Sequence, residues 1–174
     1  MAGQRIFAGI GSRSTPPAIE KQIEEISKRF NRLKYILRSG GADGSDLMWE
    51  NHMELKEIYL PWKGFNKNNS DLYLDNIPQI YTDKAYQMAK NYHPYWSNLS
   101  QGAKKLMARN SFQVFGPSMD KPCDIIVCYT RDGKDSGGTG QAMRIAKSYS
   151  IPIFNLFNPG IYEMIIKSMD LKIS

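Results

Sequence analysis

Three glycine-rich segments, each of which follows a short apolar run, are the feature that most constrains the fold. The segments are 11–15, 40–45 and 136–140, and the apolar runs before the first two are 5–10 and 35–37. The third segment follows the run 124–129, which is the clearest pattern of a buried strand in the chain. Such runs, closed by turn residues and followed by helical patterns, predict βα units whose strands pair in parallel.

The stretches between these runs have helical periodicity. Ile19, Ile23, Ile26 and Phe30 recur at spacings of three and four residues, which places one apolar helix face against a core. We therefore predict an α/β protein with a Rossmann-like three-layer fold and a mainly parallel sheet. Further helices are predicted over 46–55, 100–114, 141–149 and 161–169, and further strands over 57–60 and 152–155.

Residues 61–100 interrupt this alternation. The segment is rich in Asn, Lys, Tyr and Trp, and the only helix that its pattern predicts is a short one over 84–91. We interpret it as an aromatic, basic insertion at about 61–100. The chain has 174 residues and no linker-like tract, so we expect one domain over 1–174.

The positive charge is concentrated in the middle of the chain. The formal net charge is +6, and residues 61–122 carry eight Lys and Arg against four Asp. A basic excess favours anionic partners, either nucleic acid or phosphorylated metabolites. No run of about 18 apolar residues and no signal-peptide pattern occurs, so we expect a cytoplasmic protein without a membrane partner.

The glycine-rich segments predict a phosphate site. In an open parallel sheet, ligands bind beyond the carboxyl ends of the strands, and the amides of a following helix favour an anion. The alternative is that these segments are ordinary βα turns with Gly, Ser and Asp as caps. Neither GxxxxGK[ST] nor GxGxxG after the first strand occurs, which disfavours a P-loop NTPase and a standard dinucleotide-binding dehydrogenase.

Five short motifs carry a family resemblance. They are AGIGSR at 8–13, SGGADGSDLMWE at 39–50, EIYLPW at 57–62, Arg109 with Asn110, and 137–146 before the run at 151–154. In this order they resemble the SLOG superfamily, most closely its YspA-like members and more distantly the LOG phosphoribohydrolases and the Smf/DprA proteins. The resemblance covers most of the chain except 63–100 and the C-terminal helix.

The resemblance implies a nucleotide or nucleotide-derived ligand over the strand ends. It implies that Arg109 matches an arginine in the site of LOG enzymes, and that relatives form homodimers or higher homo-oligomers. No cofactor is implied. The candidate binding residues are Gly11, Ser12, Arg13, Gly40, Gly41, Ser45, Trp62, Asn110, Gly137, Gly138, Thr139 and Gly140.

One departure from the LOG pattern concerns catalysis. LOG enzymes carry PGGxGTxxE, whose Glu serves N-glycosidic cleavage, whereas this chain has Gln141 in place of the Thr and Arg144 in place of the Glu. Arginine can neither activate water nor stabilise an oxocarbenium-like centre, which argues against LOG-type hydrolysis.

Other acidic residues remain as catalytic candidates. Asp46 and Glu50 are four residues apart and share a helix face, where either could act as general base while Arg109 and Arg13 neutralise a phosphate. The alternative is a helix N-terminus enriched in acids to complement its dipole. With only His52 and His93 as histidines, no metal site is predicted.

The aromatic residues of the insertion suit a lid over a nucleotide or a groove for a single strand, because bases stack on rings and lysines hold phosphates. The alternative is that they pack the insertion onto the domain.

Three functions follow from the sequence: a nucleotide-ligand binding protein that senses or sequesters its ligand, a nucleotide N-glycosidase or related hydrolase, and a DprA-like single-stranded DNA binder.

Overall fold

The computed structural model describes residues 3–174 as a three-layer α/β fold. All strand pairs of its six-stranded sheet are parallel, in the order β4-β3-β2-β1-β5-β6. This confirms the predicted Rossmann-like fold. The strands are β1 (Ile6–Gly11), β2 (Ile36–Ser39), β3 (Lys56–Leu60), β4 (Leu72–Tyr73), β5 (Ile125–Tyr129) and β6 (Ile153–Asn155).

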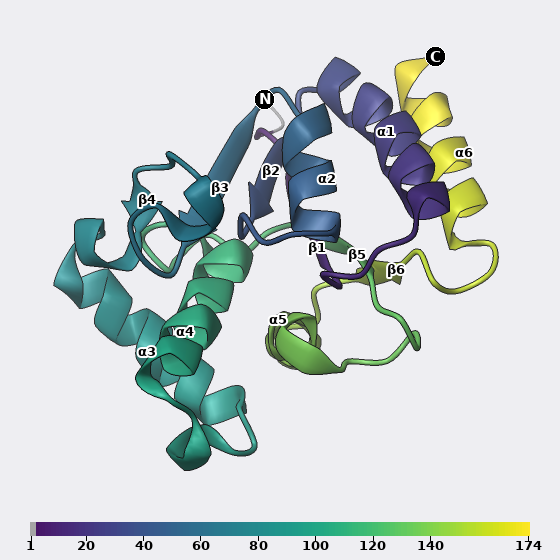
Figure 1. Cartoon of the computed structure of the whole chain (residues 1–174). Coiled ribbons are helices and arrows are strands. Elements are labelled where there is room, and N and C mark those ends of the chain that lie inside the picture. The colour runs from purple at the N-terminus through teal and green to yellow at the C-terminus, as the bar shows by residue number, and fades with distance from the viewer. Residues whose placement is uncertain (1–2) are drawn as a thin grey trace.

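Six α-helices cover the two faces of the sheet. Figure 1 shows α1, α2 and α6 on one side of the sheet and α4 and α5 on the other, with α3 beside α4. The helices are α1 (Pro17–Arg32), α2 (Ser45–His52), α3 (Gln79–Tyr92), α4 (Gln101–Phe115), α5 (Gly137–Ser148) and α6 (Ile161–Ile173). The one-turn 3₁₀ helices are η1 (Phe65–Lys67), η2 (Leu74–Asn76) and η3 (Trp96–Asn98).

Each face of the sheet has its own core. On the α1, α2 and α6 side, Phe7 lies against Phe30 and Trp49 with ring centroids 4.6 and 5.1 Å apart. On the other side, Ile126 and Val114 pack with the apolar face of α5. The period-3.6 pattern of α1 predicted this arrangement, since Ile19, Ile23, Ile26 and Phe30 are all buried.

The segment 61–100 differs from the predicted insertion. Its residues 72–73 form β4, which extends the sheet beyond β3 as an edge strand. The predicted helix over 84–91 begins earlier, at Gln79, because Pro78 supplies the extended residue before the first turn. Ala85 and Ala89 of α3 are buried, so α3 packs closely on α4.

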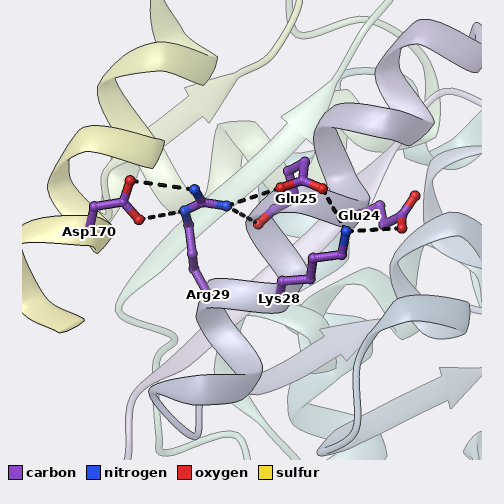
Figure 2. Close-up of polar contacts among 5 residues, drawn as sticks. All are labelled: Glu24, Glu25, Lys28, Arg29 and Asp170. Carbon is purple, nitrogen blue, oxygen red and sulfur yellow. Dashed lines mark hydrogen bonds and ion pairs between the residues drawn. The ribbon is translucent and has the colours of Figure 1, made fainter.

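The C-terminal helix α6 is tied to α1 by ion pairs. Arg29 lies between Asp170 of α6, with Nε to Oδ1 at 2.7 Å, and Glu25 of α1, with Nη1 to Oε2 at 3.3 Å. Figure 2 shows this network, to which Lys28 adds contacts with Glu24 and Glu25. Within 3–174, no helix is long and apolar enough to cross a membrane.

Candidate functional site

A pocket of about 380 Å³ opens at the carboxyl edge of the sheet, and we call it the central pocket. Residues from all three glycine-rich segments line it, together with one face of α4. The structure therefore brings together segments that lie more than 120 residues apart in the chain. The candidate residues that line the pocket are Gly11, Ser12, Arg13, Asp46, Arg109, Asn110, Gly137, Gly138 and Thr139.

The first segment is held in place by backbone hydrogen bonds on both sides. The amide of Ser12 donates to the Tyr129 carbonyl at 2.8 Å, and the Ser12 carbonyl accepts from the Ser45 amide at 3.1 Å. The Ser45 hydroxyl lies 2.8 Å from the Thr15 hydroxyl. Ser45 is fully buried and does not line the pocket. Its hydrogen bonds instead stabilise the first segment from the protein interior.

The second segment contributes mainly backbone. The Gly40 carbonyl accepts a hydrogen bond from Arg109, and the Gly41 carbonyl accepts one from the Asn66 side chain at 3.0 Å. A Cβ at Gly40 would collide with the side chains of Arg109 and Gln113, so glycine is needed for this close approach. Gly40 and Gly41 are not among the residues that line the pocket; they contact residues that hold it together.

Arg109 is buried in the pocket wall and fixed from three directions. Its guanidinium donates to Gly40 and, from Nε, to the Asn110 side-chain oxygen at 3.0 Å. The ring of Phe65 lies 5.7 Å from the guanidinium carbon, a cation-π distance. Burial lowers the pKa of Arg109, the negative charge of Asp46 acts in the opposite direction, and the positive charge of Arg13 lowers the pKa further. An arginine nevertheless stays protonated, so a positive charge is fixed in this wall.

Asp46 faces the same pocket from the first turn of α2. Burial raises the pKa of its carboxyl to about 6, although the charge of Arg109 and the Ala42 amide, at 3.4 Å, act in the opposite direction. Within the described residues, Asp46 and Arg109 form no ion pair closer than 4.0 Å. The pocket thus holds a carboxyl group that titrates near neutrality beside a permanent cation.

The third segment differs from its predicted form. The predicted helix over 141–149 begins at Gly137, so Gly137, Gly138 and Thr139 form its first turn rather than a preceding loop. Amides at the start of a helix lack intrahelical acceptors and face outward. A Cβ at Gly138 would come no closer than 3.9 Å to Met107, which leaves this turn open to the pocket. Gly140 instead packs against the Asp135 backbone.

Gln141 and Arg144 point away from the pocket. The Gln141 amide nitrogen donates to the Ala89 carbonyl at 2.9 Å, and Arg144 Nε donates to the Tyr92 carbonyl at 3.0 Å. Arg144 also donates to the Gln141 side-chain oxygen at 2.9 Å. These two residues fasten α5 to the C-terminal half of α3, which gives a structural reason for their departure from the LOG pattern.

Two further candidates lie outside the central pocket. The Glu50 carboxylate accepts a hydrogen bond from the Asn68 side chain at 2.7 Å and does not join Asp46 in the pocket. Trp62 packs on Phe65 with ring centroids 5.4 Å apart, and 38% of its surface is exposed. Phe65 contacts Arg109, which lines the pocket, so Phe65 connects Trp62 to the pocket wall.

Several lining residues were not among the sequence candidates. Thr130 and Arg131 follow β5 directly, so the rule that ligands bind at carboxyl ends of strands could have identified them. Leu106, Met107 and Gln113 give no such signal, because only the packing of α4 across the sheet edge places them there. The remaining additional lining residues are Ile10, Ala42 and Ser136.

The basic surface of residues 61–122 lies mainly on α3, α4 and the loops that join them to the sheet. In the described chain, every ion pair within 4.0 Å lies outside this segment. Lys104 instead stacks on Trp96 at 5.6 Å, and Lys84 lies 6.0 Å from the Tyr81 ring. No cluster of three metal-ligating side chains occurs among residues 3–174.

Comparison with known proteins adds one fold relative. No family model and no curated protein matches the sequence. A solved structure of DNA processing protein A from Helicobacter pylori, described for its single-stranded DNA binding mode, is similar with a TM-score of 0.55 at 15% identity. The match covers 94% of this chain and 72% of that chain. It shows a shared Rossmann-like fold.

Proposed function

We propose that the chain is a single nucleotide-binding domain, which holds a nucleotide or nucleotide-derived phosphorylated ligand in the central pocket as a sensor or sequestering protein. The observation that carries this proposal is that the open first turn of α5 and the buried Arg109 line the same pocket. Free helix amides and a fixed guanidinium together favour a phosphate. Arg13 and Arg131 add positive charge at the pocket mouth.

The rest of the pocket suits the nucleoside. Ile10, Leu106 and Met107 supply apolar contact for a base, and the Asp46 carboxyl can accept a sugar hydroxyl hydrogen bond. A volume of about 380 Å³ lies in the range of small-molecule sites. A ligand that is bound but not hydrolysed also accounts for the sequence, because Arg144 occupies the position of the LOG catalytic Glu.

The decisive experiment compares two identical substitutions. Gly138 and Gly102 are each the second residue of a helix, and a Cβ has open space at both positions. Gly138→Asp would place a carboxylate at the phosphate position, whereas Gly102→Asp lies outside the pocket. With AMP, ADP and ADP-ribose as probes in calorimetry, we expect Gly138→Asp to weaken binding at least about tenfold. Equal affinities in the two variants would refute the proposed site.

A second candidate is a single-stranded DNA binder. It is favoured by the likeness to a protein described as binding single-stranded DNA. The lysines of 61–122 also favour it, because among residues 3–174 none of them lies within 4.0 Å of a carboxylate. This function requires that affinity rises with oligonucleotide length and falls steeply with salt. An affinity that does not depend on length would exclude it.

A third candidate is a nucleotide N-glycosidase or related hydrolase. It rests on Asp46, whose pKa near 6 suits a general acid or base, with Arg109 neutralising phosphate. Glu50 enters this scheme only if the Asn68 contact opens. Release of a free base or ribose phosphate that is lost in Asp46→Asn would support it, and a panel without products would exclude it.

A homodimer belongs to the same proposal, since the resemblance implies self-association. Light scattering behind size-exclusion chromatography, with and without AMP, measures the mass directly. A mass of one chain under both conditions would remove the dimer from the proposal.

A further inference from the structure

A second, shallower hollow adjoins the central pocket and shares two of its residues. Its lining consists of Arg13, Ser14, Thr15, Pro16, Tyr129 and Arg131, and we call it the outer hollow. Arg13 and Arg131 line both spaces, so these two side chains form the boundary between them. A ligand that reached from one space into the other would pass Arg13 and Arg131.

The two shared arginines are not engaged elsewhere. Both are exposed, and the described chain gives neither guanidinium a hydrogen-bond or ion-pair partner. By contrast, Arg29, Arg38, Arg109 and Arg144 all donate to carboxylates or carbonyls. Two cations that line one hollow without a counter-charge attract an anion, and an anion between them offsets their mutual repulsion.

The outer hollow also offers contact for a nucleoside. Pro16 is exposed and presents apolar surface, whereas Tyr129 lines the hollow but is buried, with 9% of its surface exposed. The Tyr129 ring lies 6.4 Å from the Phe157 ring, which keeps 44% of its surface exposed. Ser14 adds an exposed hydroxyl. Bases and sugars bind such mixed aromatic and hydroxyl surfaces without a strict hydrogen-bond pattern.

From this geometry we infer that the site takes a ligand with two nucleoside units joined through phosphate. One unit occupies the central pocket, the other lies in the outer hollow, and the linking phosphate sits between Arg13 and Arg131. This inference rests on the proposed nucleotide site and specifies its ligand class. Two sources share this chemistry: the end of an oligonucleotide strand, linked by a phosphodiester, and a free dinucleotide, linked by a pyrophosphate.

The test measures how much a second nucleoside unit increases the binding affinity. Calorimetry would compare AMP, ADP, the 5′-phosphorylated adenosine dinucleotide pApA and diadenosine diphosphate. ADP has a charge similar to that of pApA but only one nucleoside, so it corrects for charge alone. We expect at least one two-unit ligand to bind about tenfold or more tightly than ADP. Preference for pApA assigns a strand end, and preference for diadenosine diphosphate assigns a free dinucleotide.

Three variants locate the second unit. Arg131→Ala and Ser14→Glu should reduce the ratio of two-unit to ADP affinity to about two or less, because they remove the bridging cation or place a negative charge in the outer hollow. Arg32→Ala removes an exposed arginine at the end of α1 and should leave that ratio unchanged.

Failure of this inference can be separated from failure of the proposed function. If AMP binds and Gly138→Asp weakens that binding, but the second nucleoside adds nothing beyond ADP, the nucleotide site stands and the two-unit ligand is refuted. If neither AMP nor any two-unit ligand binds, the proposed site itself fails. If both Arg131→Ala and Ser14→Glu still bound a two-unit ligand more tightly than ADP by the wild-type ratio, the placement of the second nucleoside in the outer hollow would also be overturned.

Discussion

The Asn110 side chain donates a hydrogen bond to the Gly138 carbonyl at 3.0 Å, which joins α4 to the first turn of α5. The preceding residue, Arg109, donates to the Gly40 carbonyl on the other side of the pocket. Two consecutive residues of one helix therefore form hydrogen bonds with two different glycine-rich segments. The packing of α4 therefore places a fixed cation and the first turn of α5 in the same pocket.

The pKa of Asp46 predicts a pH-dependent stability. Burial raises this pKa from 3.8 to about 6, so between these values the folded state binds more protons than the unfolded state. The contribution of Asp46 to stability is therefore greatest below pH 4 and is lost as pH rises through 6. The full shift corresponds to roughly 3 kcal/mol. Denaturant unfolding of wild type and Asp46→Asn at pH 4 and pH 7 measures this change.

Groups other than Asp46 titrate alike in wild type and Asp46→Asn, so their effect cancels in the difference between the two unfolding free energies. We expect wild type to lose stability relative to Asp46→Asn between pH 4 and pH 7. An unchanged difference between the two proteins would mean that the Asp46 carboxyl is not buried as described.

Arg144→Glu tests whether the departure from the LOG pattern can be reversed. Arg144 donates to the Tyr92 carbonyl and to Gln141, so a glutamate there would lose both contacts and face Asp135. We expect a loss of about 1–3 kcal/mol in unfolding free energy and no gain of N-glycosidase activity. Detection of free base released from AMP by this variant would contradict the placement of Arg144.

Gly44 and Gly64 form a matched pair of glycines with positive φ, at 79° and 73°. A Cβ at Gly44 would collide with the carbonyls of Ser12 and Arg13, whereas a Cβ at Gly64 has open space. Alanine at Gly64 therefore incurs only backbone strain of about 1 kcal/mol. Gly44→Ala should be destabilised further and should weaken AMP binding, because Ser12 and Arg13 must move. Equal effects of the two substitutions on both measurements would argue against this close packing.

The Arg29–Asp170 contact between α1 and α6 predicts a modest coupling energy (Figure 2). Asp170 is 55% exposed, so solvent screens the interaction despite the 2.7 Å distance. A double-mutant cycle with Arg29→Met and Asp170→Asn should give about 0.5–1 kcal/mol. The corresponding cycle for Lys28 and Glu25, which lie wholly on α1, should give less. A larger value for the second pair would mean that helix-local contacts dominate.

Much of the architecture could be predicted from local sequence. The alternation of apolar runs, glycine-rich turns and the periodic pattern of α1 indicated parallel βα units, and the carboxyl-edge rule placed Ser12 and Gly138 at the same edge. The start of α5 was misplaced because Gly137, Gly138 and Gly140 favour a loop by propensity, whereas packing of Gln141 against α3 extends the helix into them. Glu50 and Asp46 share a face in sequence, but Asn68 holds Glu50 outside the pocket.

The sequence by itself determined the alternation of the five predicted strands with helices and the sheet edge at which the central pocket opens, because both follow from periodicity and turn chemistry within single segments. Only the tertiary structure decided which side chains meet there. Arg109 and Met107 reach the pocket because α4 packs across the sheet edge, and β4 joins the sheet through pairing with β3. Such contacts join residues far apart in the chain, and no local pattern records the distance between them.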